Sequence, residues 1–343
     1  MQIKLPSVIC AALLTAPLLS TQAASYSVFV TNEKSGEISV IDGDTLAVTA
    51  TLPVGKRPRG VEATKDGSKV FVALSGSPRM APGADPDREN TPRADKAADG
   101  IGVLDVKTGK VEKKLDAGSD PEEFALSPDE KDLYVANEDA SSASILNIES
   151  GKITSQIKVS EEPEGMNLNP VSGLLYVTCE EEGEVYVVDP KEGKAVTHFK
   201  VGGRPRTTAF TPDGKRAYVP AETDASISVI DAEGHKVVGT IKLEGERMLP
   251  MGTAMSPDGK ELYVSTGRGN TIAVINTATD KVEAHIPVGT RPWGIVLSPD
   301  GSKLFTANGA SDDVSVIDVK ARKELSRVKV GSGPWGVAVA PKL

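Results

Sequence analysis

Short runs of alternating apolar and polar residues, separated by turn residues, recur along the chain. In the last complete copy they predict strands at residues 294–297, 303–306, 314–318 and 324–330. Residues 298–301 (SPDG) separate the first two strands; there proline presets φ for a type I turn and glycine accepts a positive φ. Four short strands joined by tight turns are typical of a small antiparallel sheet.

The four-strand pattern repeats with a period near 42 residues. Its second strand begins at Val28, Val70, Leu133, Leu175, Ala217, Leu262 and Leu304, at spacings of 42, 63, 42, 42, 45 and 42 residues. This period with several short strands predicts an all-β, seven-bladed β-propeller of four-stranded antiparallel blades. The chain after residue 24 starts with a second strand and ends with a first strand at 336–340. We therefore expect the C-terminal strand to pair with the N-terminal three and close the ring.

An aromatic residue occupies the second position of each of these strands. The positions are Phe29, Phe71, Tyr134, Tyr176, Tyr218, Tyr263 and Phe305. Such regular placement indicates packing between neighbouring blades rather than stacking on a ligand.

The first 24 residues have the pattern of a secretory signal peptide. Lys4 provides a positive start, Val8–Leu19 an apolar run, and Ala23 and Ala24 the small residues of a cleavage site. The apolar run is too short to span a membrane, and no later run is long enough. We therefore expect residues 25–343 to form one propeller domain in the periplasm or outside the cell.

The chain has two cysteines, and Cys10 would leave with the signal peptide. Cys179 then has no partner for an intramolecular disulfide. In a repeat position it is expected to be a small, buried apolar side chain.

The formal net charge of −9 argues against nucleic acid as a partner, because phosphate binding favours basic surfaces. Carboxylates concentrate in one part of the chain, at Glu138, Asp139, Glu161, Glu162, Glu164, Glu180, Glu181, Glu182, Glu184 and Glu222. Such oxygens are suitable ligands for Ca²⁺, but their spacing is unlike that of an EF-hand loop. We interpret them as a solvated acidic face and expect no cofactor and no metal site.

A proline precedes the first strand of each blade, and the residue after it differs from copy to copy. These seven residues are Arg59, Glu122, Glu164, Arg206, Met251, Trp293 and Trp335, which we call the post-proline ring. Alternation of strand direction places them at the inner ends of the blades on one face. Their variability within a repeated scaffold predicts a site for a ligand or partner, and tryptophan and arginine are common in binding hot spots. The alternative is that they fill the mouth of the central channel, with arginine and glutamate pairing across it.

The same face receives the insertion that lengthens one spacing to 63 residues. Residues 75–100 (SGSPRMAPGADPDRENTPRADKAADG) lie between the second and third strands of their copy and have no periodic pattern. Long loops of this kind are commonly functional or disordered, and both alternatives stay open.

Three segments, Val28–Asn32 (VFVTN), Leu133–Asn137 (LYVAN) and Leu175–Cys179 (LYVTC), resemble the YVTN family of β-propeller repeats. A narrower resemblance lies in Gly118–Asp129 (GSDPEEFALSPD), Val135–Ala140 (VANEDA), Ser265–Gly269 (STGRG) and the long insertion. These segments are similar to the β-propeller proteins associated with PQQ-dependent alcohol catabolism. The resemblance implies an accessory role beside a periplasmic quinoprotein oxidation system, without a defined reaction.

The histidines do not favour an enzyme. His198 and His285 fall in outermost strands and His235 in a hairpin on the opposite face, so none reaches the ring as a general base. We therefore favour a monomeric, non-enzymatic protein that binds a periplasmic protein or small ligand through the post-proline ring. The alternatives are a metal-dependent hydrolase or lactonase of the propeller class, using Glu122 and Glu164, and a surface structural protein.

Overall fold

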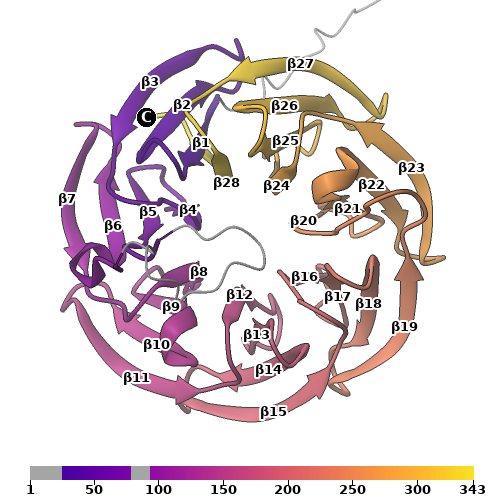
Figure 1. Ribbon diagram of the computed structural model, residues 1–343, viewed down its shortest axis with the longest axis horizontal. Coiled ribbons are helices and arrows are strands. Elements are labelled where there is room, and N and C mark those ends of the chain that lie inside the picture. Colours follow the sequence, from indigo (N-terminus) through magenta and orange to yellow (C-terminus); the bar gives the residue numbers. More distant parts are fainter. Residues whose placement is uncertain (1–24, 79–92) are drawn as a thin grey trace, which may run out of the picture.

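The computed structural model describes residues 25–78 and 93–343, which form seven four-stranded antiparallel sheets arranged as a closed ring (Figure 1). Blade 1 combines both ends of this range: β28 (Pro334–Pro341) pairs with β1 (Tyr26–Asn32), followed by β2 (Glu37–Asp42) and β3 (Val48–Pro53). The predicted ring closure is therefore confirmed, and it gives β1 a partner on each side.

The other six blades each use four consecutive strands, from the centre of the ring outward. Blade 2 is β4 (Val61–Ala63), β5 (Lys69–Leu74), β6 (Gly100–Asp105) and β7 (Lys110–Leu115). Blade 3 is β8 (Pro121–Leu126), β9 (Asp132–Asn137), β10 (Ser142–Asn147) and β11 (Lys152–Lys158). Blade 4 is β12 (Pro163–Leu168), β13 (Leu175–Cys179), β14 (Glu184–Asp189) and β15 (Lys194–Lys200).

Blade 5 is β16 (Ala209–Phe210), β17 (Arg216–Ala221), β18 (Ser226–Asp231) and β19 (Lys236–Lys242). Blade 6 is β20 (Thr253–Met255), β21 (Glu261–Ser265), β22 (Thr271–Asn276) and β23 (Lys281–Pro287), and blade 7 is β24 (Pro292–Leu297), β25 (Lys303–Asn308), β26 (Asp313–Asp318) and β27 (Lys323–Lys329). Three single-turn 3₁₀ helices lie in described loops: η1 (Lys96–Ala98), η2 (Glu138–Ala140) and η3 (Gly267–Gly269). The strands of blade 7 extend up to two residues beyond the predicted bounds, except that β27 ends at Lys329, one residue before the predicted end.

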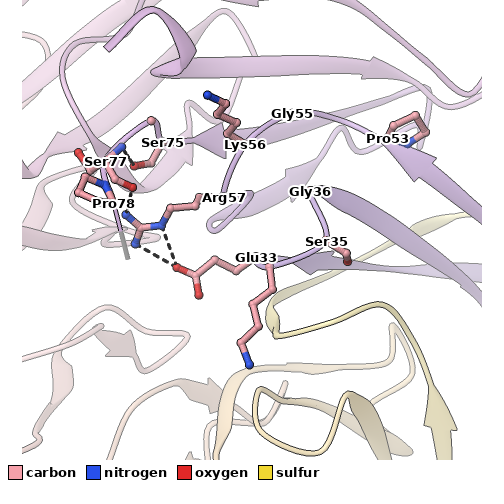
Figure 2. Close-up of a pocket in the computed structure, with 12 residues that line it drawn as sticks. Glu33, Ser35, Gly36, Pro53, Gly55, Lys56, Arg57, Ser75, Ser77 and Pro78 are labelled. Atoms are coloured by element: carbon pink, nitrogen blue, oxygen red, sulfur yellow. Dashed lines mark hydrogen bonds and ion pairs between the residues drawn. The ribbon is translucent and has the colours of Figure 1, made fainter. Parts of the chain in front are cut away.

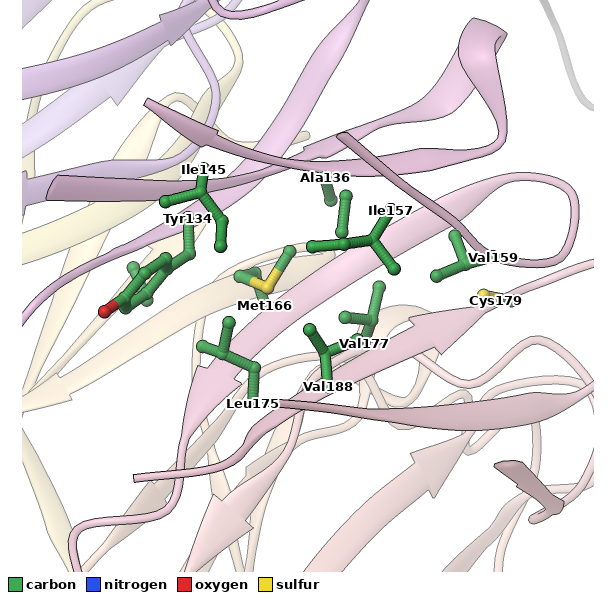
Figure 3. Packing of buried hydrophobic residues seen from close by; sticks show 12 residues of the cluster. Tyr134, Ala136, Ile145, Ile157, Val159, Met166, Leu175, Val177, Cys179 and Val188 are labelled. Atoms are coloured by element: carbon green, nitrogen blue, oxygen red, sulfur yellow. The ribbon is translucent and has the colours of Figure 1, made fainter. Parts of the chain in front are cut away.

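Apolar side chains from neighbouring blades form the core. Between blades 3 and 4, Met166, Leu175 and Val177 pack against residues of β9 to β11, and Cys179 belongs to the same cluster (Figure 3). Cys179 is fully buried and has no disulfide, as predicted, and burial raises the pKa of its thiol to about 12. All seven aromatic residues predicted to pack between blades are at most 8% exposed. This burial confirms their structural role.

The innermost strands approach each other closely, and glycine permits this. A Cβ atom on Gly294 would lie 2.5 Å from the carbonyl oxygen of Trp335, and one on Gly60 would lie 2.7 Å from that of Glu122. Gly165, Gly252 and Gly336 stand in the same relation to the next blade. The backbone of most post-proline residues is therefore held in contact with the preceding blade.

One sequence prediction lies wholly outside the described residues and another lies partly outside them. These are the signal peptide at 1–24 and the middle of the 75–100 insertion; the described ends of that insertion do connect β5 to β6. Within the described part of the chain, no helix has the length and apolar character needed to cross a bilayer.

Candidate functional site

Six of the seven blade-to-blade loops turn inward through a residue with positive φ just before the proline. The φ angles of Arg57, Asp120, Glu162, Arg204 and Arg291 lie between 40° and 59°, in the left-handed region that L-residues disfavour. Gly333 takes the same place in blade 1 with a φ of 67°. A charged side chain is thus kept at five positions where glycine would avoid the strain, and strained backbone of this kind tends to cluster at functional sites.

The post-proline ring is more buried than a solvated channel mouth would be. Arg59, Glu122, Glu164, Arg206, Met251 and Trp335 are between 3% and 9% exposed, and Trp293 is half-buried. Arg59 pairs with Glu122, and Arg206 pairs with Glu164. In both pairs the glutamate occupies the place next to the arginine in the ring. Buried arginine and glutamate are stable only in such pairs.

The first cluster surrounds Arg59 at the junction of blades 2 and 3. Its guanidinium pairs with Asp120 at 2.5 Å and with Glu122, and donates to the carbonyl of Pro121 at 3.4 Å. The Oε2 atom of Glu138, at the start of η2, lies 3.9 Å from Nη1 of Arg59. The Nε–H of Arg59 is buried and has no hydrogen-bond partner among the described residues.

Glu138 is more exposed to solvent than the other charged residues of the Arg59 cluster, because 32% of its side chain is accessible. Burial raises the pKa of Glu138 to about 7; the Arg59 charge opposes this shift, and the Glu164 and Asp120 charges add to it. Burial also acts to raise the pKa of Asp120, but Arg59 and hydrogen bonds from Ser75 and Ser77 outweigh it and lower that pKa. One accessible carboxyl group is therefore poised near neutrality beside a fixed positive charge.

The second cluster surrounds Arg206 at the junction of blades 4 and 5. Arg206 pairs with Glu164 at 3.1 Å, with Glu180, and through Nε with Glu222 at 2.7 Å. Arg204 also pairs with Glu180, through an Nε contact of 2.6 Å. Burial raises the pKa of Glu180, and the Glu164 charge adds to this, whereas for Glu164 the Arg206 charge overcomes burial and lowers the pKa. The hydrogen bond between the two carboxyl groups contributes to both shifts.

The aromatic part of the ring lies in blades 7 and 1. Trp293 and Trp335 stack with centroids 5.6 Å apart and planes inclined at 30°. The guanidinium carbons of Arg206 and Arg291 lie 5.5 and 4.9 Å from the Trp293 ring centroid, within reach of cation–π attraction. These contacts connect the ring residues from Glu164 in blade 4, through Arg206 and Trp293, to Trp335 in blade 1.

The repeated proline positions in the sequence predict the ring itself but not several of the residues that pair with it. Asp120, Arg204 and Arg291 lie one position before the prolines and carry the left-handed φ angles. Glu138, Glu180 and Glu222 were placed in a solvated acidic face. That interpretation is wrong for Glu180, which is 4% exposed and pairs with Arg204 and Arg206 in the interior. It is also wrong for Glu164 and Glu184, which are 9% and 8% exposed.

Carboxylate oxygens of Asp120, Glu122 and Glu138 lie within 4.8 Å of one another, close enough to hold a cation. Oxygen atoms of this kind suit Ca²⁺. However, Arg59 pairs with Asp120 and Glu122 and already compensates their charge. The geometry therefore favours an arginine–carboxylate centre over a metal centre.

The sequence matches a known protein family over most of its length. Residues 22–170 and 166–331 each match the family described as lactonase, seven-bladed β-propeller. The chain belongs to this lactonase family. The Arg59 and Arg206 clusters both lie inside the matched residues.

Solved structures related to this lactonase-family chain share its fold at low identity. A chain of Kuenenia stuttgartiensis hydrazine synthase is 21% identical with a TM-score of 0.73, over 85% of this chain and 92% of that one. A Bacteroides uniformis protein proposed to be a 6-phosphogluconolactonase is 17% identical with a TM-score of 0.73, over 92% and 99%. A functionally unknown protein from Desulfotomaculum acetoxidans is 18% identical with a TM-score of 0.74, over 92% and 98%. No curated protein matches the sequence.

Proposed function

We propose that the protein hydrolyses a small lactone at the Arg59 cluster, with Glu138 as the general base. Glu138 carries the proposal: its carboxyl group is partly exposed, its pKa is raised to about 7, and it lies 3.9 Å from Arg59. A base with a pKa near the working pH transfers protons most effectively. Membership of the lactonase family and the resemblance to a proposed 6-phosphogluconolactonase support the reaction class.

The proposed reaction needs no group beyond water and the side chains already described. The Glu138 carboxylate takes a proton from water, whose oxygen bonds to the lactone carbonyl carbon. The carbonyl electron pair moves to its oxygen, and the Arg59 charge stabilises the resulting oxyanion. When the carbonyl re-forms, the ring C–O bond breaks, and protonated Glu138 returns the proton to the leaving alkoxide. The product is the open-chain hydroxy acid.

Other residues of the Arg59 cluster and Trp293 have supporting roles in this proposal. Asp120 and Glu122 fix the Arg59 guanidinium, so its charge does not need to reorganise during the reaction. Trp293, half-buried on the same face, offers apolar surface against which a sugar-like ring can pack.

The test is hydrolysis of glucono-δ-lactone, followed by acid release and corrected for the buffer rate. We expect Glu138→Gln to lower kcat by about 10²–10⁴-fold, the usual contribution of a general base. The matched control is Asp139→Asn, which removes a carboxylate from the same turn that pairs with the exposed Lys96. It should change kcat less than about twofold. Equal losses in both variants, or no hydrolysis by the wild type of this and a γ-lactone panel, would overturn the proposal.

A non-enzymatic accessory role beside a periplasmic PQQ-dependent oxidation system stays a prediction. The observation in its favour is that the segments resembling those proteins, 118–129 and 135–140, contain Asp120, Glu122 and Glu138 of the Arg59 cluster. A partner in such a system would be captured equally by the wild type and by Glu138→Gln. A wild-type protein that captures no periplasmic protein would count against this role.

A further inference from the structure

A cavity of about 660 Å³ lies between blades 1 and 2, on the face that carries the post-proline ring (Figure 2). Three loop segments line it, within residues 33–36, 53–57 and 75–78. They are the β1–β2 loop, the loop that joins blade 1 to blade 2, and the start of the β5–β6 loop. This cavity is separate from the carboxylates of the Arg59 cluster.

Arg57 ties the two walls of the cavity together. Its Nε and Nη2 donate to Oε1 of Glu33 at 3.1 and 3.0 Å, and its Nη1 donates to the carbonyl of Ser77 at 2.7 Å (Figure 2). The backbone of Arg57 is held in the left-handed region, at a φ of 40°. Among the described residues these contacts use three of the five guanidinium N–H groups, and the other two have no partner there. The cavity is therefore preformed and has directed donors at its wall.

The lining is positively charged although the chain as a whole carries −9. Its described residues include Lys34, Lys56 and Arg57 and one acid, Glu33, which is three positive charges to one negative. Lys56 pairs with Asp95 at 2.5 Å, but both side chains are about half exposed or more, and such surface pairs contribute little. The Lys34 ammonium has no hydrogen bond or ion pair within the described residues. Both lysines can therefore turn to an incoming anion.

Glycines allow two of the lining loops to pack directly against each other. Gly36 and Gly55 pack against each other so tightly that a Cβ atom on Gly36 would lie 2.7 Å from the Gly55 carbonyl oxygen. Hydroxyl groups of Ser35, Ser75 and Ser77 are also in the lining. Lysine and arginine provide the donors that oxyanions require, whereas the serine hydroxyls already bond to Glu37 and Asp120.

We propose that this cavity binds a small, multiply charged oxyanion carrying phosphate or carboxylate groups. The proposal does not depend on the hydrolase: the ligand is held by Lys34, Lys56 and the free N–H groups of Arg57, none of which belongs to the proposed reaction. The cavity nevertheless adjoins the Arg59 cluster, because Ser75, Ser77 and Arg57 all act on the carboxylate of Asp120.

The test is calorimetric titration of the full mature protein with inorganic phosphate and, separately, with citrate at low ionic strength. We expect one site per chain for at least one of the two anions, and a weakening of at least tenfold in the double variant Lys34→Ala/Lys56→Ala. Binding of phosphate alone assigns the site to a phosphate group, and binding of citrate alone assigns it to carboxylates.

The control variant removes the same charge elsewhere. Lys131→Ala/Lys260→Ala changes two lysines whose side chains are 74% and 80% exposed and lie in other loops. It should bind the anions within about twofold of the wild type. Absence of saturable binding to either anion, or an equal loss in both double variants, would overturn the proposal. Thermal unfolding of each variant checks folding, and exposed substitutions of this kind should leave the unfolding midpoint nearly unchanged.

Discussion

At the scale of single residues, the site depends on carboxyl groups that the fold holds in different protonation states. Arg206 keeps Glu164 ionised, while Glu180 and Glu138 retain protons to higher pH because burial outweighs the nearby arginines. The same effect extends to the innermost strands. Burial raises the pKa of Glu62 to about 7 and that of Glu123 to about 8, and the charges of Glu164 and Glu62 add to the shift at Glu123.

Glu123 gives a prediction for stability against pH. Its ordinary pKa is 4.5, so between about pH 4.5 and 8 the folded protein binds more protons than the unfolded chain. The free energy of unfolding should therefore be fully retained below about pH 4.5 and should fall as the pH rises towards 8. Glu123→Gln should flatten this fall and raise the unfolding free energy at pH 8 by roughly 1–3 kcal/mol. Urea unfolding at pH 5 and pH 8 measures it; an unchanged pH dependence in the variant would show that Glu123 is not responsible.

The post-proline positions could be predicted from sequence because every blade repeats the proline and the surrounding strand. The identity of their partners could not. Glu138 and Glu180 come from loops between second and third strands, and they meet the arginines only once two blades have packed side by side. Their local sequence also looks like that of an exposed acidic loop, so no nearby residue signals burial.

At the scale of elements, glycine and hydroxyl side chains fix where the ring residues stand. Thr31 donates to the carbonyl of Arg59 at 2.7 Å and Ser265 to that of Trp293 at 2.6 Å, in each case from the second strand of one blade to the next blade. The glycine that follows the ring residue in five blades allows this approach. Glu123 and Thr207 stand in its place in blades 3 and 5, beside the two arginine clusters.

Gly294→Ala tests the close approach of these strands. The added Cβ atom would meet three backbone atoms of blade 1, the nearest at 2.5 Å, so a strand must move and displace Trp335. We expect a loss of roughly 1–3 kcal/mol of unfolding free energy, as for other overpacked sites. Gly239→Ala in β19 is the control, because its Cβ atom would make an ordinary 3.6 Å contact with Val229. Equal denaturation midpoints for the two variants would refute the steric argument.

At the scale of the whole molecule, the period and the chain ends were enough to predict seven blades and their closure through β28 and β1. The proposed function depends on the differences between blades. Blades 2 to 5 bring arginines and carboxylates to the ring, whereas blades 6, 7 and 1 bring Met251, Trp293 and Trp335. The face is thus divided into a charged part and an apolar part, as a site for a polar ring-shaped ester requires.

The pH dependence of kcat/KM for lactone hydrolysis by the wild-type protein tests the central claim most directly. This parameter reports the pKa of the essential base in the free enzyme. Because Glu138 must be ionised to accept a proton, the enzymatic rate should rise about tenfold per pH unit below about pH 7 and level off above it. A rate above the buffer blank that stays constant from pH 5 to pH 9, or no rate above the blank, would contradict the assignment of Glu138 and of this site.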